Sequence, residues 1–381
     1  MFGWHLNINF YRTESEINTI TGRAPETQTE LLERSVEVLR ARIPTTWRLI
    51  ADEQYKLSVG RRPDAVLRLT APDGSEALLL LEAKRVLERR DVLPMIDQLS
   101  DLASSFPTAY PVVVGRYLSQ SVRAALEKRD TSYIDATGNV RLDIPSPAIY
   151  VSDRGEDRDP WRSRSGRPRG SLKGGPASRV VRALVDYAKG WKIRDLVASS
   201  GASTGATYRV LEFLQREGLV VRDESGLYTV PNWRELLEAW SKDYAFLKSG
   251  AATSFVDPRG LSNLVARAAD TTDIRYAFSG SLAAHEWAPY APSKSAMVYV
   301  DNVTQAAKAW SLRPVTSGGN VLLAEPESDV VFQRTTIARS GVIVAAAAQV
   351  AVDLLTGPGR NPSEGEELLD WMEHNEPAWR L

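Results

Sequence analysis

The chain has 381 residues, enough for two or three domains, and its formal net charge of −1 gives no overall indication of nucleic-acid binding. It has no cysteine and only three histidines, which excludes disulfides, thiolate nucleophiles, cysteine zinc sites and a histidine-based metal cluster. The N-terminal residues do not read as a signal peptide, and the longest apolar run, Val342–Ala348, is too short to span a membrane. We therefore expect a cytoplasmic protein with no membrane contact.

The first predicted elements are a helix and a β-hairpin. Apolar residues recur at helical spacing over Gln28–Arg42. Two apolar runs, Ala65–Leu69 and Ala77–Leu81, flank a turn at Asp73-Gly74. This arrangement is typical of a hairpin with a tight turn.

Charged residues stand at the open end of this hairpin. Asp64 enters the first strand, and Glu82 and Lys84 leave the second on one side, because strand side chains alternate. Two carboxylates can hold Mg²⁺, and a lysine beside them can activate water at a phosphodiester. A plain ion pair on an exposed strand end is the alternative interpretation.

The strings Arg62-Pro63-Asp64 and Glu82-Ala83-Lys84 resemble the signature of the PD-(D/E)XK nuclease superfamily. The resemblance implies that Asp64 and Glu82 are metal ligands for Mg²⁺ and that Lys84 is the catalytic lysine. Gln98, on the next predicted helix, is a further candidate for the catalytic site. Glu30 or Glu33 could supply an additional acid from the first helix.

The elements after the hairpin complete one α/β domain, which we place at residues 1–153. We expect a helix at Asp91–Ser104, a strand at Pro111–Gly115, a helix at Ser119–Arg129 and a closing strand pair within Ser132–Ile144. The predicted fold is a restriction-endonuclease-like PD-(D/E)XK α/β domain.

A basic linker follows at residues 154–176. Its positive charges include Arg162, Arg164, Arg167 and Arg169, in a stretch rich in Gly, Ser and Pro. These arginines could lie along DNA phosphates or in a minor groove. A linker that is merely soluble is the other possibility.

Residues 177–232 have the pattern of a helix-turn-helix followed by a two-stranded wing. Helices are predicted at Ala177–Ala188, at Lys192–Ser199 and from Ser203 or Thr204 to Glu217, with Gly201 at the turn. The segment resembles winged-helix transcriptional regulators, above all in LQREGLVVRDESGLYTV.

The winged-helix resemblance implies that the third helix enters the major groove of double-stranded DNA and that the wing touches the backbone. On the third helix the expected DNA-binding residues are Ser203, Thr204, Thr207, Tyr208 and Arg209, the last three being predicted as exposed. Arg222 is the expected contact on the wing. A winged helix that contacts only protein is the alternative.

Residues 233–381 are predicted as a C-terminal α/β domain. An amphipathic helix at Trp233–Lys248 begins it, and an acidic segment at Ser363–Glu376 lies near its end. Between them we expect alternating strands and helices: strands at 274–278, 296–300, 321–323 and 330–332, and helices at 281–287, 303–310 and 347–355.

Gly280-Ser281 after a strand, with Asp301 after the next, suggests degenerate nucleotidyltransferase ancestry. The second acid of the active pattern is replaced by Val303, although Asp329 could imitate a third acid. A single remaining carboxylate cannot assemble a two-metal phosphoryl-transfer site. We therefore expect a scaffold without this chemistry.

Residues 177–381 resemble AbiEi antitoxins of type IV toxin–antitoxin systems. The resemblance rests on the winged helix and on several strings after it, among them FSGSLAAHEWAPYAP, VYVDN and QVAVDLLTGPGRNPSEGEELLDWM. The resemblance implies a DNA-binding transcriptional regulator that represses its own operon and opposes a nucleotidyltransferase-like toxin. The N-terminal domain departs from this pattern. Two alternatives thus stay open: a Mg²⁺-dependent DNA endonuclease targeted by its winged helix, and a protein-binding adaptor.

Overall fold

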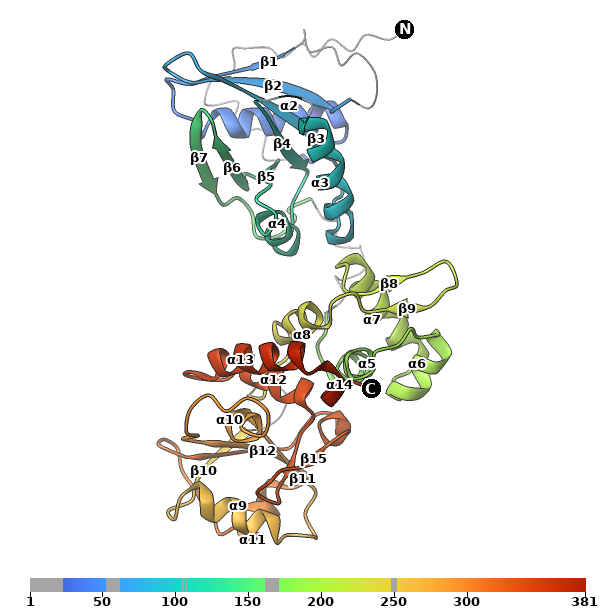
Figure 1. Ribbon diagram of the computed structural model, residues 1–381, viewed down its shortest axis with the longest axis vertical. Helices are drawn as coiled ribbons and strands as arrows, with labels where there is room; N and C mark the ends of the chain where they lie inside the picture. The colour runs from blue at the N-terminus through green and yellow to red at the C-terminus, as the bar shows by residue number, and fades with distance from the viewer. Residues whose placement is uncertain (1–22, 53–61, 105, 107, 162–170, 248–251) are drawn as a thin grey trace. The chain divides into compact units, whose positions relative to one another are not determined.

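The computed structural model describes residues 23–52, 62–104, 106, 108–161, 171–247 and 252–381. Contacts divide the chain into two compact units, Met1–Pro168 and Arg169–Leu381 (Figure 1). Among the described helices, none has the length and apolar character needed to cross a bilayer. Both units combine helices with β-sheet, which confirms the mixed α/β class.

The first unit is built on a sheet whose strands follow chain order. The strands are β1 (Arg48–Ala51), β2 (Ala65–Thr70), β3 (Glu76–Lys84), β4 (Ala109–Gly115), β5 (Ser132–Asp135), β6 (Val140–Pro145) and β7 (Ala148–Asp153). β3, β4 and β5 are parallel, and the other neighbouring pairs are antiparallel.

Helices cover both faces of this sheet. The helices are α2 (Gln28–Arg40), α3 (Arg89–Ser104) and α4 (Gln120–Glu127). Side chains alternate along β4, so Val112 and Val114 pack into the core beneath α2, whereas Val113 packs with α3 and α4. The parallel strands are therefore apolar on both faces, as their sequences predicted.

The second unit begins with a small helical module. Its elements are α5 (Gly175–Asp186), α6 (Ile193–Ser200), α7 (Thr204–Arg216), β8 (Val221–Arg222) and β9 (Tyr228–Thr229). β8 and β9 form an antiparallel pair, which Trp191 extends by a bridge to Tyr228. Gly201 ends α6 in the left-handed conformation, with φ of 63°, so the chain turns sharply into α7.

The rest of the second unit is a mixed sheet with helices packed on it. The sheet runs β13-β10-β14-β12-β11-β16-β15. Its strands are β10 (Ala252–Val256), β11 (Tyr276–Ser279), β12 (Ala296–Val300), β13 (Arg313–Pro314), β14 (Val321–Ala324), β15 (Thr336–Ile337) and β16 (Ile343–Val344). The helices are α8 (Trp233–Ser241), α9 (Leu261–Ala269), α10 (Gly280–Ala284), α11 (Val303–Ala309), α12 (Ala347–Leu355), α13 (Asn361–His374) and α14 (Glu376–Trp379).

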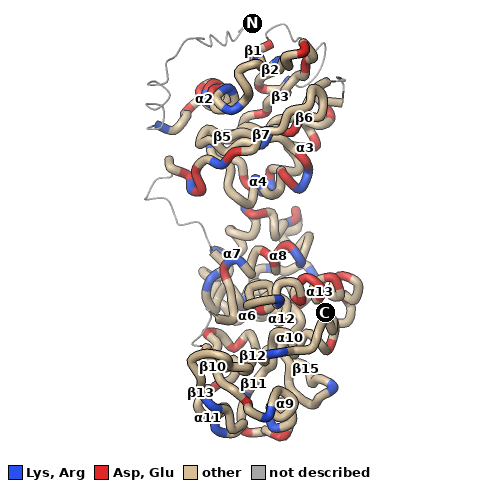
Figure 2. Tube along the Cα trace, turned by 90° about the vertical axis from the view of Figure 1, so that its left-hand side faces the viewer, with Lys and Arg blue, Asp and Glu red and all other residues tan. Residues whose placement is uncertain are grey.

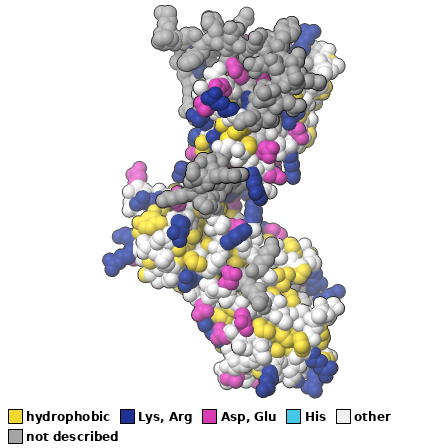
Figure 3. All heavy atoms as spheres, turned by 180° about the vertical axis from the view of Figure 1, so that it is seen from behind, with side chains coloured by type: hydrophobic (Ala, Val, Ile, Leu, Met, Phe, Trp, Pro, Cys, Tyr) yellow, Lys and Arg dark blue, Asp and Glu magenta, His cyan; other side chains and the backbone are white. Residues whose placement is uncertain are grey.

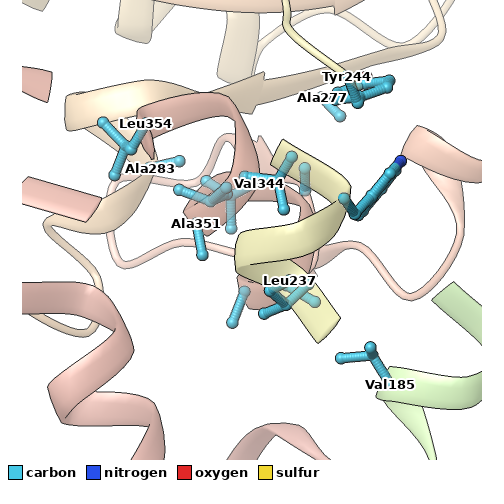
Figure 4. Close-up of a cluster of buried hydrophobic side chains, with 14 of the residues drawn as sticks. Val185, Leu237, Tyr244, Ala277, Ala283, Val344, Ala351 and Leu354 are labelled. Atoms are coloured by element: carbon cyan, nitrogen blue, oxygen red, sulfur yellow. The ribbon is translucent and has the colours of Figure 1, made fainter. Parts of the chain in front are cut away.

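The main hydrophobic core of the second unit joins the helix-turn-helix module to the sheet domain that follows it. Figure 4 shows Val185 of α5, Leu237 of α8 and Ala351 of α12 within a single buried cluster. α12 packs against α5, α8 and α13. The expected boundary between residues 232 and 233 therefore passes through one continuous core.

Some predicted elements differ from the structure. Val330–Phe332, expected as a strand, lies in a 3₁₀ helix, η2 (Asp329–Phe332). A run of three apolar residues is too short for the spacing of its side chains to distinguish a strand from a 3₁₀ helix. The helix expected at Trp233–Lys248 ends at Ser241.

Both ends of the segment expected as a linker pack on the flanking units. Arg116 forms an ion pair of 2.6 Å with Asp159 in the first unit. Leu172 is buried in the core of the second, and its backbone N–H donates to Asp243 at 2.7 Å.

Candidate functional site

α7 is held at its start by a side-chain cap. The Ser203 hydroxyl accepts a hydrogen bond from the backbone N–H of Ala206 at 3.3 Å. The cap occupies a backbone donor that the first turn leaves unpaired, so the beginning of the helix is well defined. Val210, Leu211 and Leu214 then fix α7 to the core by one face.

The opposite face of α7 is exposed near its N-terminus. Ser203, Thr204, Tyr208 and Arg209 all reach solvent there, and Tyr208 keeps 52% of its surface exposed. Gly205 lies among them, so the backbone is open to close approach. The helix thus presents a polar surface with one cation and one aromatic ring.

Thr207 does not belong to this surface, and its predicted exposure is wrong. Its side chain is fully buried, and its hydroxyl donates to the backbone carbonyl of Ser203 at 3.1 Å. Thr207 follows the same helical stripe as Val210, Leu211 and Leu214, so it packs inward.

The wing carries a second cation. The Arg222 guanidinium lies 5.5 Å from the ring centre of Tyr228 on the paired strand, a cation–π distance. Arg222 is exposed beside the turn that ends at Gly226. Arg162, Arg164, Arg167 and Arg169 lie outside the described residues.

The described surface has no strong excess of one charge on the face seen in Figure 3, where Lys and Arg side chains are interspersed with Asp and Glu. A local acidic surface occurs on α13, which Figure 2 shows largely in red. Arg234 of α8 binds it through Glu366, Asp370 and Glu373, at 2.7, 2.6 and 3.1 Å. This arginine joins α8 to α13.

The hairpin of the first unit brings the predicted nuclease residues together in part. Ala65 pairs with Leu81 in the β2–β3 register, so Asp64 and Glu82 are neighbours across the two strands. An Asp64 carboxylate oxygen accepts the backbone N–H of Ala83 at 2.8 Å. The Gln98 amide of α3 donates to Glu82 at 3.4 Å.

Lys84 lies on the same strand end but is paired elsewhere. Its ammonium group forms an ion pair of 3.2 Å with Asp91 of α3. Glu30, one of the two additional acids expected from the first helix, forms a capping box with Thr27.

The residues at the hairpin end match magnesium in chemical type, because carboxylate and amide oxygens are the ligands this ion prefers. Among the described residues there is nevertheless no group of three acids or histidines placed to hold a metal. Asp64, Glu82 and the Gln98 oxygen are the groups that would have to hold the ion, together with water.

A buried polar network, which we did not predict, lies in the second unit. Asp353 of α12 accepts hydrogen bonds from Ser279 at 2.5 Å, Tyr299 at 2.8 Å and Gln349 at 3.1 Å. Gln349 also donates to Tyr244 at 3.1 Å. Burial raises the pKa of Asp353 to about 7, although the three donors oppose this shift.

The network reaches the helix-turn-helix module through Arg182 of α5. Its guanidinium pairs with Asp186 at 2.8 Å and donates to Gln349 and to the carbonyls of Val330 and Gln333, each at 3.3 Å. Arg182 and Asp186 are both buried. The sequence offered one signal for this network. Gln349 and Asp353 are polar residues spaced four apart in an otherwise apolar predicted helix, so they share one buried face.

The residues of the nucleotidyltransferase-like pattern do not form a catalytic cluster. Asp329 pairs with Arg275 at 3.2 Å, and the backbone N–H of Asp301 donates to the Arg275 carbonyl. Ser281 bonds to Asn361 instead.

A comparison with known protein families gives a match within the second unit. Residues 229–365 match the family AbiEi_2, described as "Transcriptional regulator, AbiEi antitoxin, Type IV TA system". We refer to residues 229–365, which match this family, as the AbiEi segment. It contains Tyr244, Ser279, Tyr299, Gln349 and Asp353, and it leaves out the first unit and most of the helix-turn-helix module. No curated protein and no solved structure matches the chain.

Proposed function

We propose that the chain is a DNA-binding transcriptional regulator and antitoxin of a type IV toxin–antitoxin or phage-defence system. The observation that carries this proposal is the exposed N-terminal half of α7, with Tyr208 and Arg209, on a module that shares its core with the AbiEi segment. The module has the element order of a winged helix, α5-α6-α7-β8-β9.

On this proposal α7 enters the major groove of double-stranded DNA with its N-terminal residues against base edges. Arg209 can bind a guanine through two hydrogen bonds, and Tyr208 can contact a base or a phosphate. Thr207 is buried and has no contact with DNA. Arg222 and the arginines at 162, 164, 167 and 169 would bind phosphates, which adds affinity without sequence preference.

The test measures binding of the full chain to duplex DNA from upstream of its own gene, by fluorescence anisotropy over a range of salt concentrations. Arg209→Ala should weaken binding to the best sequence by about 1–3 kcal/mol. Replacing the four arginines at 162–169 by glutamine should weaken binding to all DNA sequences alike. It should also lower the slope of the logarithm of affinity against the logarithm of salt concentration by roughly 3 to 4.

Arg259→Ala is the matched control, because Arg259 is an exposed arginine outside the helix-turn-helix module. This variant should bind as the parent does. If the parent has no affinity for any duplex at low salt, the module is a protein-contact domain and the adaptor interpretation replaces this proposal.

The antitoxin part of the proposal concerns a nucleotidyltransferase-like toxin as partner. Co-expression of the full chain with a toxin-like gene from the neighbouring locus should restore growth, and Arg209→Ala should protect equally well. Loss of DNA binding with retained protection would separate the two activities. If the intact chain does not bind the toxin or does not restore growth of cells that express it, the antitoxin assignment is removed.

A second candidate function is Mg²⁺-dependent cleavage of DNA, favoured by the cross-strand placement of Asp64 and Glu82 with Lys84 beyond them. Bound magnesium would neutralise charge on a phosphodiester and favour ionisation of a water molecule. Asp64 and Glu82 would hold the ion, and Lys84 would have to leave Asp91 to stabilise charge on the phosphate.

The cleavage assay uses the full chain with supercoiled plasmid and Mg²⁺ or Mn²⁺. Asp64→Asn and Glu82→Gln should abolish cutting, and Lys84→Ala should slow it by about 10²-fold or more. Asp91→Asn is the control, since it releases Lys84 and should preserve cutting. A parent protein that cuts no DNA under these conditions shows that this unit is a scaffold.

A further inference from the structure

A hollow of about 750 Å³ opens in the first unit between α4 and the strands β5, β6 and β7. Gln120, Arg123, Ala124 and Glu127 line it from one face of α4, at helical spacing. Tyr133, Arg141 and Ser152 are cross-strand neighbours on the sheet side. This volume lies within the usual range for small-molecule sites.

Two arginines lie deep in the hollow. The side chains of Arg123 and Arg141 are only 11% and 14% exposed. Both guanidinium groups act on the Tyr133 hydroxyl, where their positive charges lower the pKa while burial, the largest effect, raises it. Arg141 is the cross-strand neighbour of Tyr133, and both arginines line the hollow together with this tyrosine.

The carboxylates that pair with the two arginines are themselves exposed to solvent, which weakens these ion pairs. Arg123 bonds to the neutral Asn139 side chain, and its nearest carboxylate, Asp157, is 3.9 Å away and 87% exposed. Arg141 pairs through Nη2 with Asp143 at 3.1 Å and with Asp130, which is 90% exposed, at 3.5 Å. Its buried Nη1 makes no hydrogen bond of ordinary geometry to a described residue, although the Tyr150 hydroxyl interacts with the guanidinium.

The other carboxylates in the lining are already bonded. Glu127 accepts the Tyr133 hydroxyl at 2.7 Å, and Asp153 pairs with Arg42 at 2.7 Å. A buried guanidinium whose counter-ions are exposed, and which keeps an unused donor as Arg141 does at Nη1, favours an incoming anion, and its planar donor pair fits a phosphate. Asn139, Gln120 and Ser152 add neutral polar groups to the lining of the hollow.

An aromatic ring stands at the same hollow. Tyr150 of β7 lines it and is 63% exposed, so its ring is available for stacking. An anion site on the floor together with an exposed aromatic ring fits a ligand that joins a phosphate to a flat ring. We propose that this hollow binds a nucleoside phosphate, with the phosphate between Arg123 and Arg141 and the base against Tyr150.

Two kinds of molecule carry a nucleoside phosphate: a free nucleotide and the 5′-phosphate end of a nucleic-acid strand. The experiment titrates the full chain by calorimetry with AMP, GMP, CMP and UMP, and with the four nucleosides. A 5′-phosphorylated tetranucleotide and its unphosphorylated form make up the second arm. The phosphorylated member of at least one pair should bind at least about tenfold more tightly, as expected for a charge-assisted contact.

The decisive variant is Ala124→Glu, with Ala124→Gln as its matched control. Ala124 is an exposed helix position facing the hollow, so both substitutions leave the arginine contacts intact. The added carboxylate should lower phosphate-dependent affinity by about tenfold or more, whereas the neutral glutamine should preserve it. Thermal unfolding of both variants confirms that each is folded.

Binding of the nucleotides supports the free ligand as the source, and binding of the phosphorylated tetranucleotide alone supports a strand end. The proposal is overturned if phosphorylation makes no difference in either arm. It is also overturned if Ala124→Glu binds as tightly as Ala124→Gln, because the ligand then lies elsewhere on the chain.

Discussion

Asp353 illustrates how burial changes the chemistry of one carboxyl group. It lies fully buried among Ser279, Tyr299 and Gln349, all of which donate to it. The donors favour the ionised form, but desolvation is the larger effect and raises the pKa to about 7. A group of this kind couples the stability of the fold to pH near neutrality.

The sign of this coupling follows from proton uptake. Between the ordinary carboxyl pKa of about 4 and the folded value of about 7, folded Asp353 keeps a proton that the unfolded chain has lost. The free energy of unfolding should therefore fall as pH rises from 4 to 7 and become level above 7. The loss should be on the order of a few kcal/mol.

Asp353→Asn should remove this pH dependence of the free energy of unfolding. Asparagine cannot ionise, and its side-chain oxygen can still accept the hydrogen bonds from Tyr299 and Gln349. Urea unfolding of parent and variant at pH 5 and at pH 8 measures the difference. An equal pH dependence in both proteins would show that other groups cause it. Asp257→Asn, at another buried aspartate, serves as the control.

At the scale of single elements, α5 has the most unusual environment. It is buried on nearly all sides, and its Arg182 and Asp186 form an ion pair away from water. A helix with apolar contacts all round belongs to an interior and not to a separate surface module. Thus α5 is part of the helix-turn-helix module and at the same time packs into the core of the AbiEi segment.

The contact between α8 and α13 depends on Arg234. Arg234→Ala leaves Glu366, Asp370 and Glu373 close together without their shared cation. We expect unfolding to become easier by about 1–3 kcal/mol, more than for an ordinary surface pair, because one side chain serves several acids. Urea unfolding at low and high salt measures this loss, which salt should reduce.

The control is Arg259→Ala, which removes an exposed arginine away from α13. An Arg234→Ala protein as stable as this control would mean that α8 and α13 are held by apolar packing alone.

At the scale of the whole molecule, each unit has its own core. The cores of the first unit draw on residues 31–161, and those of the second on residues 172–379. Because folding is driven chiefly by such burial, each unit has what it needs to fold alone. The AbiEi segment by itself does not, since its core includes side chains of α5 and α7.

Fragment expression tests this division. The fragment 171–381 should be soluble and should unfold cooperatively at the temperature seen for that unit in the full chain. The fragment 233–381 should fail to fold, because Leu237 and Trp240 lose their cover from the helix-turn-helix module. A cooperative transition in the shorter fragment would contradict the single core.

The sequence predicted most elements whose signals are local. Ser203 and Gly201 marked the ends of two helices, because caps act within a few residues. The placement of Asp64 beside Glu82 followed from the hairpin turn. Thr207 was misplaced since a threonine whose hydroxyl bonds to its own helix can pack as an apolar residue does.

Beyond the Gln349–Asp353 pair on α12, the buried network could not be predicted, because its other partners are far apart in the chain. Gln349 meets Tyr244 across 105 residues and Arg182 across 167. No periodicity records such pairs, and only tertiary packing brings them together. The hollow beside α4 has the same origin, since β5 and β6 separate α4 from β7 in the sequence and only the folded sheet brings the residues of its lining together.

The last residues of the chain bond to the end of α5. Leu381 donates to the Asp186 carbonyl and accepts from Ala188, and Arg380 donates to Val185, 195 residues earlier. A ribosome thus makes the proposed DNA-reading helices long before it makes the residues that close their base. If the chain is the proposed regulator, its DNA binding should appear only after residues 380 and 381 have been made, and a chain stopped before them should leave the DNA unbound.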